Sequence, residues 1–162
     1  MTRFIGDAKF QRFRKLTVCV TIHAAVKIYF AASIRGGRDD WASYLEIVRQ
    51  LGDYGQVLTE HVGNAELSAS GEGLDDRFIH DRDLEWLQSS DCLVAEVTTP
   101  SLGVGYEIGK ATEWGKPVLC LYRPAEGRAL SAMISGSNAV TLKEYQSPKE
   151  LREIIEQFLQ SK

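Results

Sequence analysis

The sequence lacks the features that define several common protein classes. It has only three cysteines, Cys19, Cys92 and Cys120, and no CxxC spacing, which argues against a disulfide framework and against a zinc knuckle. Cys92 and Cys120 each lie in an apolar run, where a buried thiol packs like a small hydrophobic side chain. We therefore expect a reducing compartment, the cytoplasm or the nucleus.

An excess of positive charge is also missing. The chain carries 19 Lys and Arg residues against 22 Asp and Glu residues, a formal net charge of −3. A broad electrostatic grip on a nucleic acid polymer is therefore not expected. Any phosphate should instead be held locally by a few backbone amides and hydroxyls, which favours a small ligand. Internal repeats and low-complexity segments are absent as well.

The first 25 residues differ from the rest of the chain. Five basic residues and one acid precede the apolar run 16–26. This pattern is typical of a signal or transit peptide, but a variable leader or an added strand explains it equally well. The run is too short to span a membrane, so no membrane association is expected. We place a single catalytic domain at residues 26–162.

Short β-rich runs alternate with helical segments from Val26 onward. The expected strands are 26–32, 56–62, 91–97 and 117–122, followed by a weak strand at 138–145. The expected helices are 39–51, 75–89, 103–114, 130–134 and 148–159. Near-continuous apolar strands favour a sheet that is covered on both faces. The prediction is an α/β, three-layer Rossmann-like (flavodoxin-like) domain with a parallel sheet of about five strands flanked by helices.

In such a sheet, ligands bind beyond the carboxyl ends of the strands. The first loop at that edge is 33–38, with the sequence SIRGGR. Its two glycines let the backbone turn closely around an anion, and Arg35 and Arg38 could bind a phosphate. The alternative is a tight turn with two solvated arginines. The loop is neither a Walker A sequence nor GxGxxG, so it specifies neither ATP nor NAD.

The second loop at that edge joins the third strand to the third helix. Ser101 could cap this helix or offer its hydroxyl to a phosphate, and both roles use the same helix start. Glycines at positions 103, 105 and 109 each weaken a helix by roughly 1 kcal/mol relative to alanine. Such a concentration is expected where a ligand or another backbone approaches closely.

Glu107 lies on the apolar stripe of this helix with Val104, Ile108 and Ala111. A first-turn glutamate that interacts with the helix dipole is the alternative, but it would face solvent. Asp83 likewise shares a helix face with apolar residues of the second helix. A buried carboxylate must be partnered, protonated or at a pocket edge.

Paired carboxyls can serve as nucleophile and acid in glycosidic cleavage. For Asp83, a structural ion pair with an arginine such as Arg35 remains the alternative. Tyr29 and His61 could point into the same cleft, although packing with a satisfied polar tip is the more common role. His80 has no neighbours in the sequence that favour a site over the surface, and Asp40 is typical of a helix start.

Several long motifs occur in the order found in one family. They are YFAASIRGGR, LTEHV, FIHDRDLEWLQ, VAEVTTPSLGVGYEIGKA and GRALSAMI. Together they resemble the 2′-deoxynucleoside 5′-phosphate N-hydrolases, which belong to the wider nucleoside deoxyribosyltransferase group. The resemblance runs from about residue 27 to residue 134.

This resemblance implies roles for individual residues. Glu107 matches the glutamate that forms a covalent deoxyribosyl-phosphate intermediate, and Asp83 matches the aspartate that assists the departing base. Tyr29 matches a tyrosine that bonds within the catalytic cluster, and His61 matches a histidine near the base. Ser131 matches a serine contributed across a homodimer interface. The expected phosphate and substrate contacts are Ser33, Ile34, Arg35, Gly37, Ser101 and Gly103.

The resemblance implies hydrolysis of the N-glycosidic bond of 2′-deoxynucleoside 5′-monophosphates, without a metal or redox cofactor. It also implies a role in removing modified or surplus deoxynucleotides from the nucleotide pool. A transferase between bases and a non-catalytic nucleotide-binding module are the alternatives. A phosphoribohydrolase is disfavoured because its usual PGGxGT loop is missing. One departure is Ala31-Ala32, where the family commonly has Cys-Gly, so the methyl group of Ala32 could crowd the sugar or base.

Overall fold

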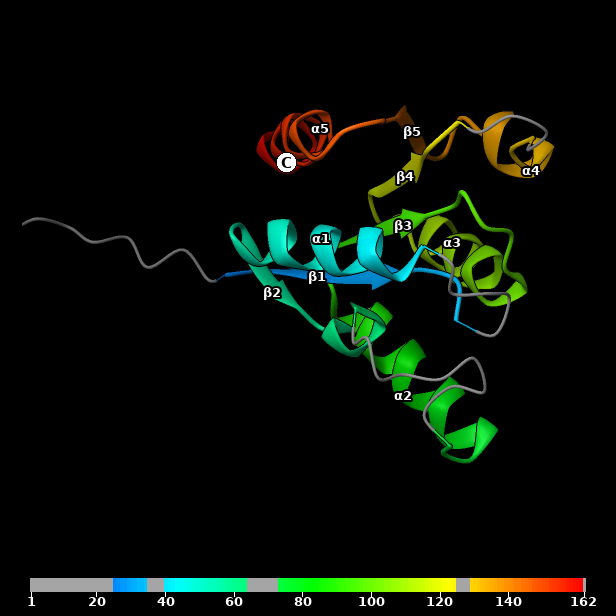
Figure 1. Cartoon of the computed structure of the whole chain (residues 1–162). Helices are drawn as coiled ribbons and strands as arrows, with labels where there is room; N and C mark the ends of the chain where they lie inside the picture. Colours follow the sequence, from blue (N-terminus) through cyan, green and yellow to red (C-terminus); the bar gives the residue numbers. More distant parts are fainter. Residues whose placement is uncertain (1–24, 35–39, 64–72, 125–128, 162) are drawn as a thin grey trace, which may run out of the picture.

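The computed structural model of the chain describes residues 25–34, 40–63, 73–124 and 129–161. Its centre is one sheet of five strands in the order β2-β1-β3-β4-β5 (Figure 1). All four pairings are parallel. The strands are β1 (Val26–Ala31), β2 (Gly55–Val57), β3 (Cys92–Glu96), β4 (Val118–Tyr122) and β5 (Thr141–Glu144). This is the flavodoxin-like strand order, so the predicted fold class is confirmed.

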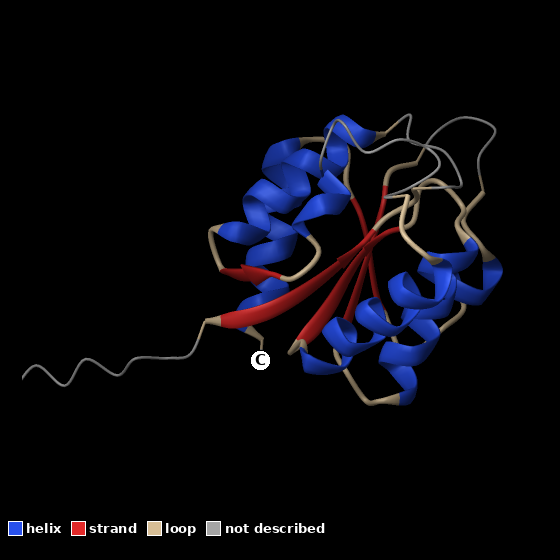
Figure 2. Cartoon of the chain, turned by 90° about the horizontal axis from the view of Figure 1, so that it is seen from below, coloured by secondary structure: helices blue, strands red, loops and turns tan. Residues whose placement is uncertain are grey.

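Helices cover both faces of the sheet (Figure 2). One apolar core lies between the sheet and the helices α1 (Trp41–Gly52) and α5 (Pro148–Gln160). A second core lies between the sheet and the helices α2 (Asp76–Ser89) and α3 (Leu102–Glu113). The short helices η1 (Glu60–Gly63) and α4 (Ala132–Ser135) complete the described elements. Within the described segments, no helix has the length and apolar character needed to cross a bilayer.

The alternation of side chains along β1 determines which residues face each core. Ile28 and Phe30 point to the core under α1 and α5. Tyr29 and Ala31 point to the core under α2 and α3, because successive strand residues face opposite sides of a sheet. The phenol of Tyr29 is therefore directed at the two helices that carry the candidate carboxylates.

Three helices begin at side chains that accept hydrogen bonds from the first turn. The Asp75 carboxylate accepts bonds from the backbone N–H groups of Arg77 and Phe78 at the start of α2. Ser101 caps α3, and Ser147 caps α5 immediately before a proline. These caps satisfy backbone donors that have no partner within the helix, which explains why the helices begin there.

The strand expected over 56–62 is much shorter than predicted. β2 ends at Val57, and the chain turns into η1 instead of continuing along the sheet. The hydroxyl of Thr59 accepts a bond from the backbone N–H of Phe30 and donates one to its carbonyl oxygen. This side chain takes the place of a strand partner beside β1, so the backbone is free to turn away. The expected leader lies outside the described residues except for Ala25.

Gly55 provides a test of how closely β2 approaches β1. A Cβ atom at this position would lie 2.2 Å from the carbonyl oxygen of Val26, its partner in the sheet register. We expect Gly55→Ala to push β2 away and to lower the free energy of unfolding by about 1–3 kcal/mol in urea denaturation. Gly52→Ala is the control, because no atom lies within 4 Å of its Cβ position. Equal unfolding energies for the two variants would contradict this packing.

Candidate active site

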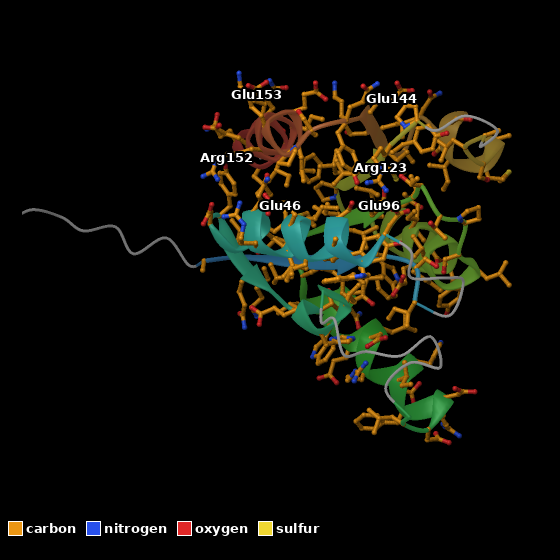
Figure 3. The ribbon with its side chains drawn as sticks, in the orientation of Figure 1. Glu46, Glu96, Arg123, Glu144, Arg152 and Glu153 are labelled. Atoms are coloured by element: carbon orange, nitrogen blue, oxygen red, sulfur yellow. The ribbon has the colours of Figure 1, made fainter. Side chains whose placement is uncertain are left out.

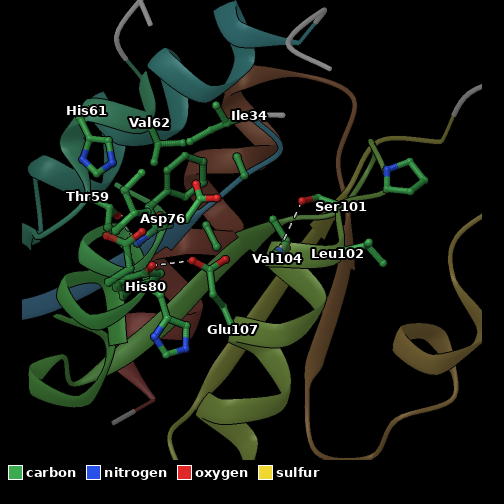
Figure 4. Close-up of a pocket in the computed structure, with 18 residues that line it drawn as sticks. Ile34, Thr59, His61, Val62, Asp76, His80, Ser101, Leu102, Val104 and Glu107 are labelled. Atoms are coloured by element: carbon green, nitrogen blue, oxygen red, sulfur yellow. Dashed lines mark hydrogen bonds between the residues drawn. The ribbon is translucent and has the colours of Figure 1, made fainter. Parts of the chain in front are cut away.

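A cavity of about 600 Å³ opens at the carboxyl edge of β1 (Figure 4). Its walls come from four segments: the end of β1 with residues 31–34, the turn 59–62, the inner face of α2, and the segment from Pro100 to Glu107. The volume lies in the range of sites for small ligands, roughly 300–1,000 Å³. Both loops that the sequence places at this edge contribute residues to the wall.

The centre of the cavity wall is a hydrogen bond between β1 and α3. The Tyr29 hydroxyl donates to Oε1 of Glu107 over 2.5 Å. Tyr29 is fully buried, and Glu107 is partly buried beside Val104 and Ile108, which are buried on the same helix face. The predicted inward orientation of Glu107 is therefore confirmed, and the solvent-facing alternative is wrong.

Burial has a strong effect on the protonation of this pair. It raises the pKa of Glu107 from 4.5 to about 7, while the bond from Tyr29 opposes the rise and the charge of Asp83 adds to it. Burial also raises the pKa of Tyr29 well above its usual range, and the carboxylates of Glu107 and Asp83 raise it further. Tyr29 thus stays a neutral donor at every physiological pH, and Glu107 changes its charge near neutrality.

Asp83 lines the same cavity from α2 and is held by the residue before it. Oδ1 of Asp83 accepts a hydrogen bond of 2.9 Å from Nε of Arg82 and lies 2.8 Å from Nη2 of the same guanidinium, with which it forms an ion pair. The Arg82 guanidinium also lies 4.5 Å from the ring centre of Trp86, one turn further along α2. A structural ion pair with an arginine was the alternative to a catalytic role for Asp83. The arginine that pairs with Asp83 is Arg82, and Arg35 lies outside the described residues.

Four of the other predicted contacts line the same cavity. His61, Ile34 and Gly103 line the cavity, and the His61 ring lies 5.8 Å from that of Trp86. Ser101 lines the cavity and also caps α3, with its oxygen 3.4 Å from the backbone nitrogen of Val104 (Figure 4). The two roles considered for this serine are therefore compatible.

Ser33 is fully buried, and its hydroxyl oxygen has no hydrogen-bond partner among the described residues. Its chain neighbours Ala32 and Ile34 both line the cavity. A buried hydroxyl without a partner is costly in the free protein, which is consistent with a ligand that supplies one. Arg35 and Gly37 lie outside the described residues.

Ser131 differs from the other predicted contacts. It is exposed at the start of α4 and lies outside the wall of the cavity in the described part of the chain.

The glycines of α3 are less constrained by packing than the sequence predicts. A Cβ at Gly105 or Gly109 would meet no atom within 4 Å, and one at Gly103 would only touch the Ser101 hydroxyl at 3.8 Å. Packing against the described residues therefore does not require these glycines.

Sequence reasoning missed His80, which lines the cavity instead of lying apart from any site. Its Nε2 lies 3.2 Å from the Tyr106 hydroxyl on α3, and its Nδ1 lies 2.9 Å from Asp81. The available signal was its position three residues before Asp83, on the same face of α2. Asp76, one turn earlier, lines the cavity for the same reason. The described residues include no cluster of three or more ligating side chains that could hold a metal ion.

The raised pKa of Glu107 predicts a cost in stability. Between the unfolded-state pKa of 4.5 and the folded-state value of about 7, the folded chain retains a proton that the unfolded chain releases, so stability falls as pH rises through this range. We expect Glu107→Gln to be more stable than the wild type at pH 8, by up to about 3 kcal/mol, and equally stable near pH 4. Thermal unfolding across this range measures the difference.

Glu113→Gln is the control, since Glu113 lies exposed on the same helix. Its unfolding energy should differ from that of the wild type only by the small contribution of an exposed ion pair with Lys110, well below the effect expected at Glu107. Equal stability of Glu107→Gln and the wild type at pH 8 would show that Glu107 is not held in a desolvated environment.

Comparison with known proteins assigns the family. The sequence matches the family described as nucleoside 2-deoxyribosyltransferase over residues 28–141. A 5-hydroxymethyl-dUMP N-hydrolase of Rattus norvegicus is 60% identical over 116 residues, which cover 70% of this chain and 71% of the rat protein. A protein of the same name from Tetraodon nigroviridis is 51% identical over 138 residues, covering 82% and 96% of the two chains. The structure of a 2-deoxyribosyltransferase from Bacillus psychrosaccharolyticus has a TM-score of 0.55 at 19% identity, covering 78% and 90%. The chain belongs to the nucleoside 2-deoxyribosyltransferase family.

Proposed function

We propose that this chain hydrolyses the N-glycosidic bond of 2′-deoxynucleoside 5′-monophosphates and releases a free base and 2-deoxyribose 5-phosphate. The observation that carries the proposal is the buried Glu107 carboxylate, bonded to Tyr29 in a cavity that also contains Asp83. The rat and Tetraodon relatives, both called 5-hydroxymethyl-dUMP N-hydrolases, support the same reaction. Such an activity would remove modified deoxynucleotides from the pool.

The reaction proceeds in two displacements. The ionised Glu107 attacks C1′ through an oxocarbenium-like transition state, so that a C–O bond forms as the C–N bond breaks. Asp83 in its protonated form gives the departing base its proton, and in its ionised form, paired with Arg82, it orients the departure of the base. Water then attacks C1′ of the glycosyl-enzyme as the bond from C1′ to the Glu107 oxygen breaks, which regenerates the Glu107 carboxylate. The water oxygen keeps one hydrogen as the hydroxyl of 2-deoxyribose 5-phosphate, and its other proton passes to Asp83, replacing the proton given to the base. Tyr29 orients Glu107 and favours its ionised form.

The phosphate is assigned to the end of the cavity where two segments meet. Ser101 stands at the beginning of α3, whose first backbone N–H groups favour an anion. Ser33 offers a buried hydroxyl beside the cavity residues Ala32 and Ile34. Two hydroxyls and a helix start fit the sequence expectation that a small phosphate is held locally.

The sharpest test is release of free base by the purified protein. Substrates are deoxynucleoside monophosphates, including 5-hydroxymethyl-dUMP and dGMP, beside the matching ribonucleotides and unphosphorylated deoxynucleosides. We expect release from the deoxymonophosphates only, with kcat/KM rising with pH through about 7, because Glu107 must lose its proton to attack. Glu107→Ala should abolish release, whereas Glu113→Ala on the same helix should not change it.

Two other outcomes identify the alternatives. Formation of a new nucleotide when a free acceptor base is added would indicate a transferase, an activity suggested by the family description. Tight binding of all substrates without turnover, unchanged by Glu107→Ala, would rule out the hydrolase and support a nucleotide-binding module.

We further propose that the protein works as a homodimer, with Ser131 contributed to the partner's cavity. The support is an exposed stripe on α3, where Leu102 is 96% exposed and Tyr106 is 46% exposed. Gly105 and Gly109 lie on the same side of α3 with open space beside their Cβ positions. Small and apolar residues at helical spacing suit close contact with another helix, and Ser131 lies outside the cavity of its own chain.

Mixing two inactive variants tests this arrangement. Glu107→Ala removes the nucleophile, and Ser131→Asp places a carboxylate near the phosphate of the partner's site. If each cavity takes Ser131 from the partner subunit, a mixed dimer has one complete site. That site combines the intact Glu107 of one subunit with the intact Ser131 of the other. We expect random mixing to restore about a quarter of wild-type base release. Mixed dimers that form, as shown by differently tagged subunits, but stay inactive would contradict a crossed site.

A further inference from the structure

Charged side chains form clusters on both faces of the sheet. On the face covered by α1 and α5, Glu96 is fully buried and accepts a bond of 3.3 Å from the Tyr145 hydroxyl. Asp40 precedes α1 as the sequence predicts, but its carboxylate makes no capping bond there and pairs with Arg123 instead. None of these four residues lies in the cavity wall that the described residues form. Figure 3 shows Glu96 and Arg123 well apart from α2, which carries the second cluster.

This second cluster is a ridge of aromatic and charged side chains along α2. Phe78, Arg82 and Trp86 are spaced four residues apart, so their side chains lie on one side of the helix. The guanidinium of Arg82 lies over both rings, 4.5 Å from the ring centre of Trp86 and 5.9 Å from that of Phe78. Cation–π attraction to each ring holds the end of the arginine side chain between them.

The ridge turns Arg82 toward its own neighbour in the chain, Asp83. Consecutive residues of a helix point about 100° apart and do not normally face each other. Nε of Arg82 nevertheless donates a hydrogen bond of 2.9 Å to Oδ1 of Asp83, and Nη2 lies 2.8 Å from the same oxygen. Asp83 lines the cavity, whereas Arg82 lies outside its wall in the described part of the chain. Arg82 therefore fixes a carboxylate of the cavity from behind.

The pair is partly shielded from solvent. The Arg82 side chain is 16% exposed and that of Asp83 24%. Arg77 on the same helix is a contrast, since its side chain is 88% exposed and its Nε lies 3.7 Å from Asp81. Solvent screens the Arg82 pair less than the Arg77 pair, so the contact at Arg82 is the stronger constraint on its partner.

The charge of Arg82 also extends to the hydrogen bond at the centre of the cavity. Burial raises the pKa of Tyr29, and the carboxylates of Glu107 and Asp83 raise it further. The Arg82 guanidinium acts in the opposite direction and lowers it. Arg82 thus influences the reacting groups without contributing to the cavity wall.

We propose that Arg82 is a positioning residue for the departure of the base, because its guanidinium, clamped by Trp86 and Phe78, holds the Asp83 carboxylate in place. The inference rests on the proposed function, since that function assigns Asp83 to the leaving base. The arginine combines a charge with a planar group that stacks on a ring and donates from two nitrogens. A lysine supplies the charge without the planar group.

The kinetic effect should appear in turnover and not in substrate binding. We expect Arg82→Gln to lower kcat for base release about tenfold, a part of the roughly 10²–10⁴-fold that acid–base catalysis contributes. KM should stay near the wild-type value, because Arg82 lies outside the cavity wall formed by the described residues. Arg82→Lys should recover only part of kcat. Arg77→Gln is the control on the same helix and should leave kcat unchanged.

A double-mutant cycle separates positioning from a structural role. Asp83→Asn removes the carboxylate that Arg82 holds. If Arg82 acts through Asp83, adding Arg82→Gln to Asp83→Asn should lower kcat further by less than about twofold. A structural role predicts the same factor in both backgrounds. Thermal unfolding of each variant shows that it is folded.

The pairing itself is measured independently of activity, in ¹⁵N spectra of the arginine side chains. We expect the Arg82 Nε–H signal, assigned with Arg82→Lys, to shift in Asp83→Asn and to stay in place in Arg77→Gln. An unchanged signal in Asp83→Asn would overturn the inference whatever the activity.

The kinetic outcomes distinguish this inference from the proposed function. Base release by the wild type with equal kcat in Arg82→Gln would overturn the positioning role alone. Equal factors in the two backgrounds of the cycle would also overturn it and leave the hydrolase intact. Absence of base release from the wild type would overturn the proposed function and this inference with it.

Discussion

The site depends on the hydrogen bond from the Tyr29 hydroxyl to Glu107, which forms where burial disfavours the ionised carboxylate. Burial raises the pKa of Glu107 to about 7, and the Tyr29 hydroxyl is the neutral donor that opposes this rise. Without that donor, the carboxyl group would hold its proton more tightly and would be a poorer nucleophile. The bond also joins the inner strand β1 to α3, so the geometry of the nucleophile follows from the packing of helix on sheet. Asp83 adds a negative charge nearby, and Arg82 compensates part of it.

The parallel sheet explains how this bond and the phosphate contacts come together. Side chains of a strand alternate between the two faces, so β1 presents Tyr29 to α2 and α3 while Phe30 packs beneath α1. The two faces therefore have different roles at the same carboxyl edge. The face under α2 and α3 carries the reacting groups. The face under α1 and α5 carries a buried polar cluster around Glu96, which fixes the segments that lead to the cavity.

Much of this arrangement can be predicted from the sequence, because it is encoded locally. Apolar runs bounded by loops predict the strands, and helical spacing predicts that Glu107 and Asp83 face inward. Long-range contacts are not encoded in this way. β2 stops early because the Thr59 side chain bonds to β1, 29 residues away. The Asp40–Arg123 pair joins residues 83 positions apart. His80 shares a face of α2 with Asp83, which the spacing indicates, but its contact with the Tyr106 hydroxyl depends on α2 packing beside α3.

The most direct measurement is the titration of the Glu107 side chain by carbon-detected NMR. Protein labelled with ¹³C at the glutamate carboxyl is followed from pH 4 to pH 9, with the Glu107→Gln spectrum used for assignment. We expect a midpoint near 7 in the wild type and a higher midpoint in Tyr29→Phe, which lacks the hydroxyl that donates to the carboxylate. A wild-type midpoint near 4.5, or the same midpoint in both proteins, would contradict it.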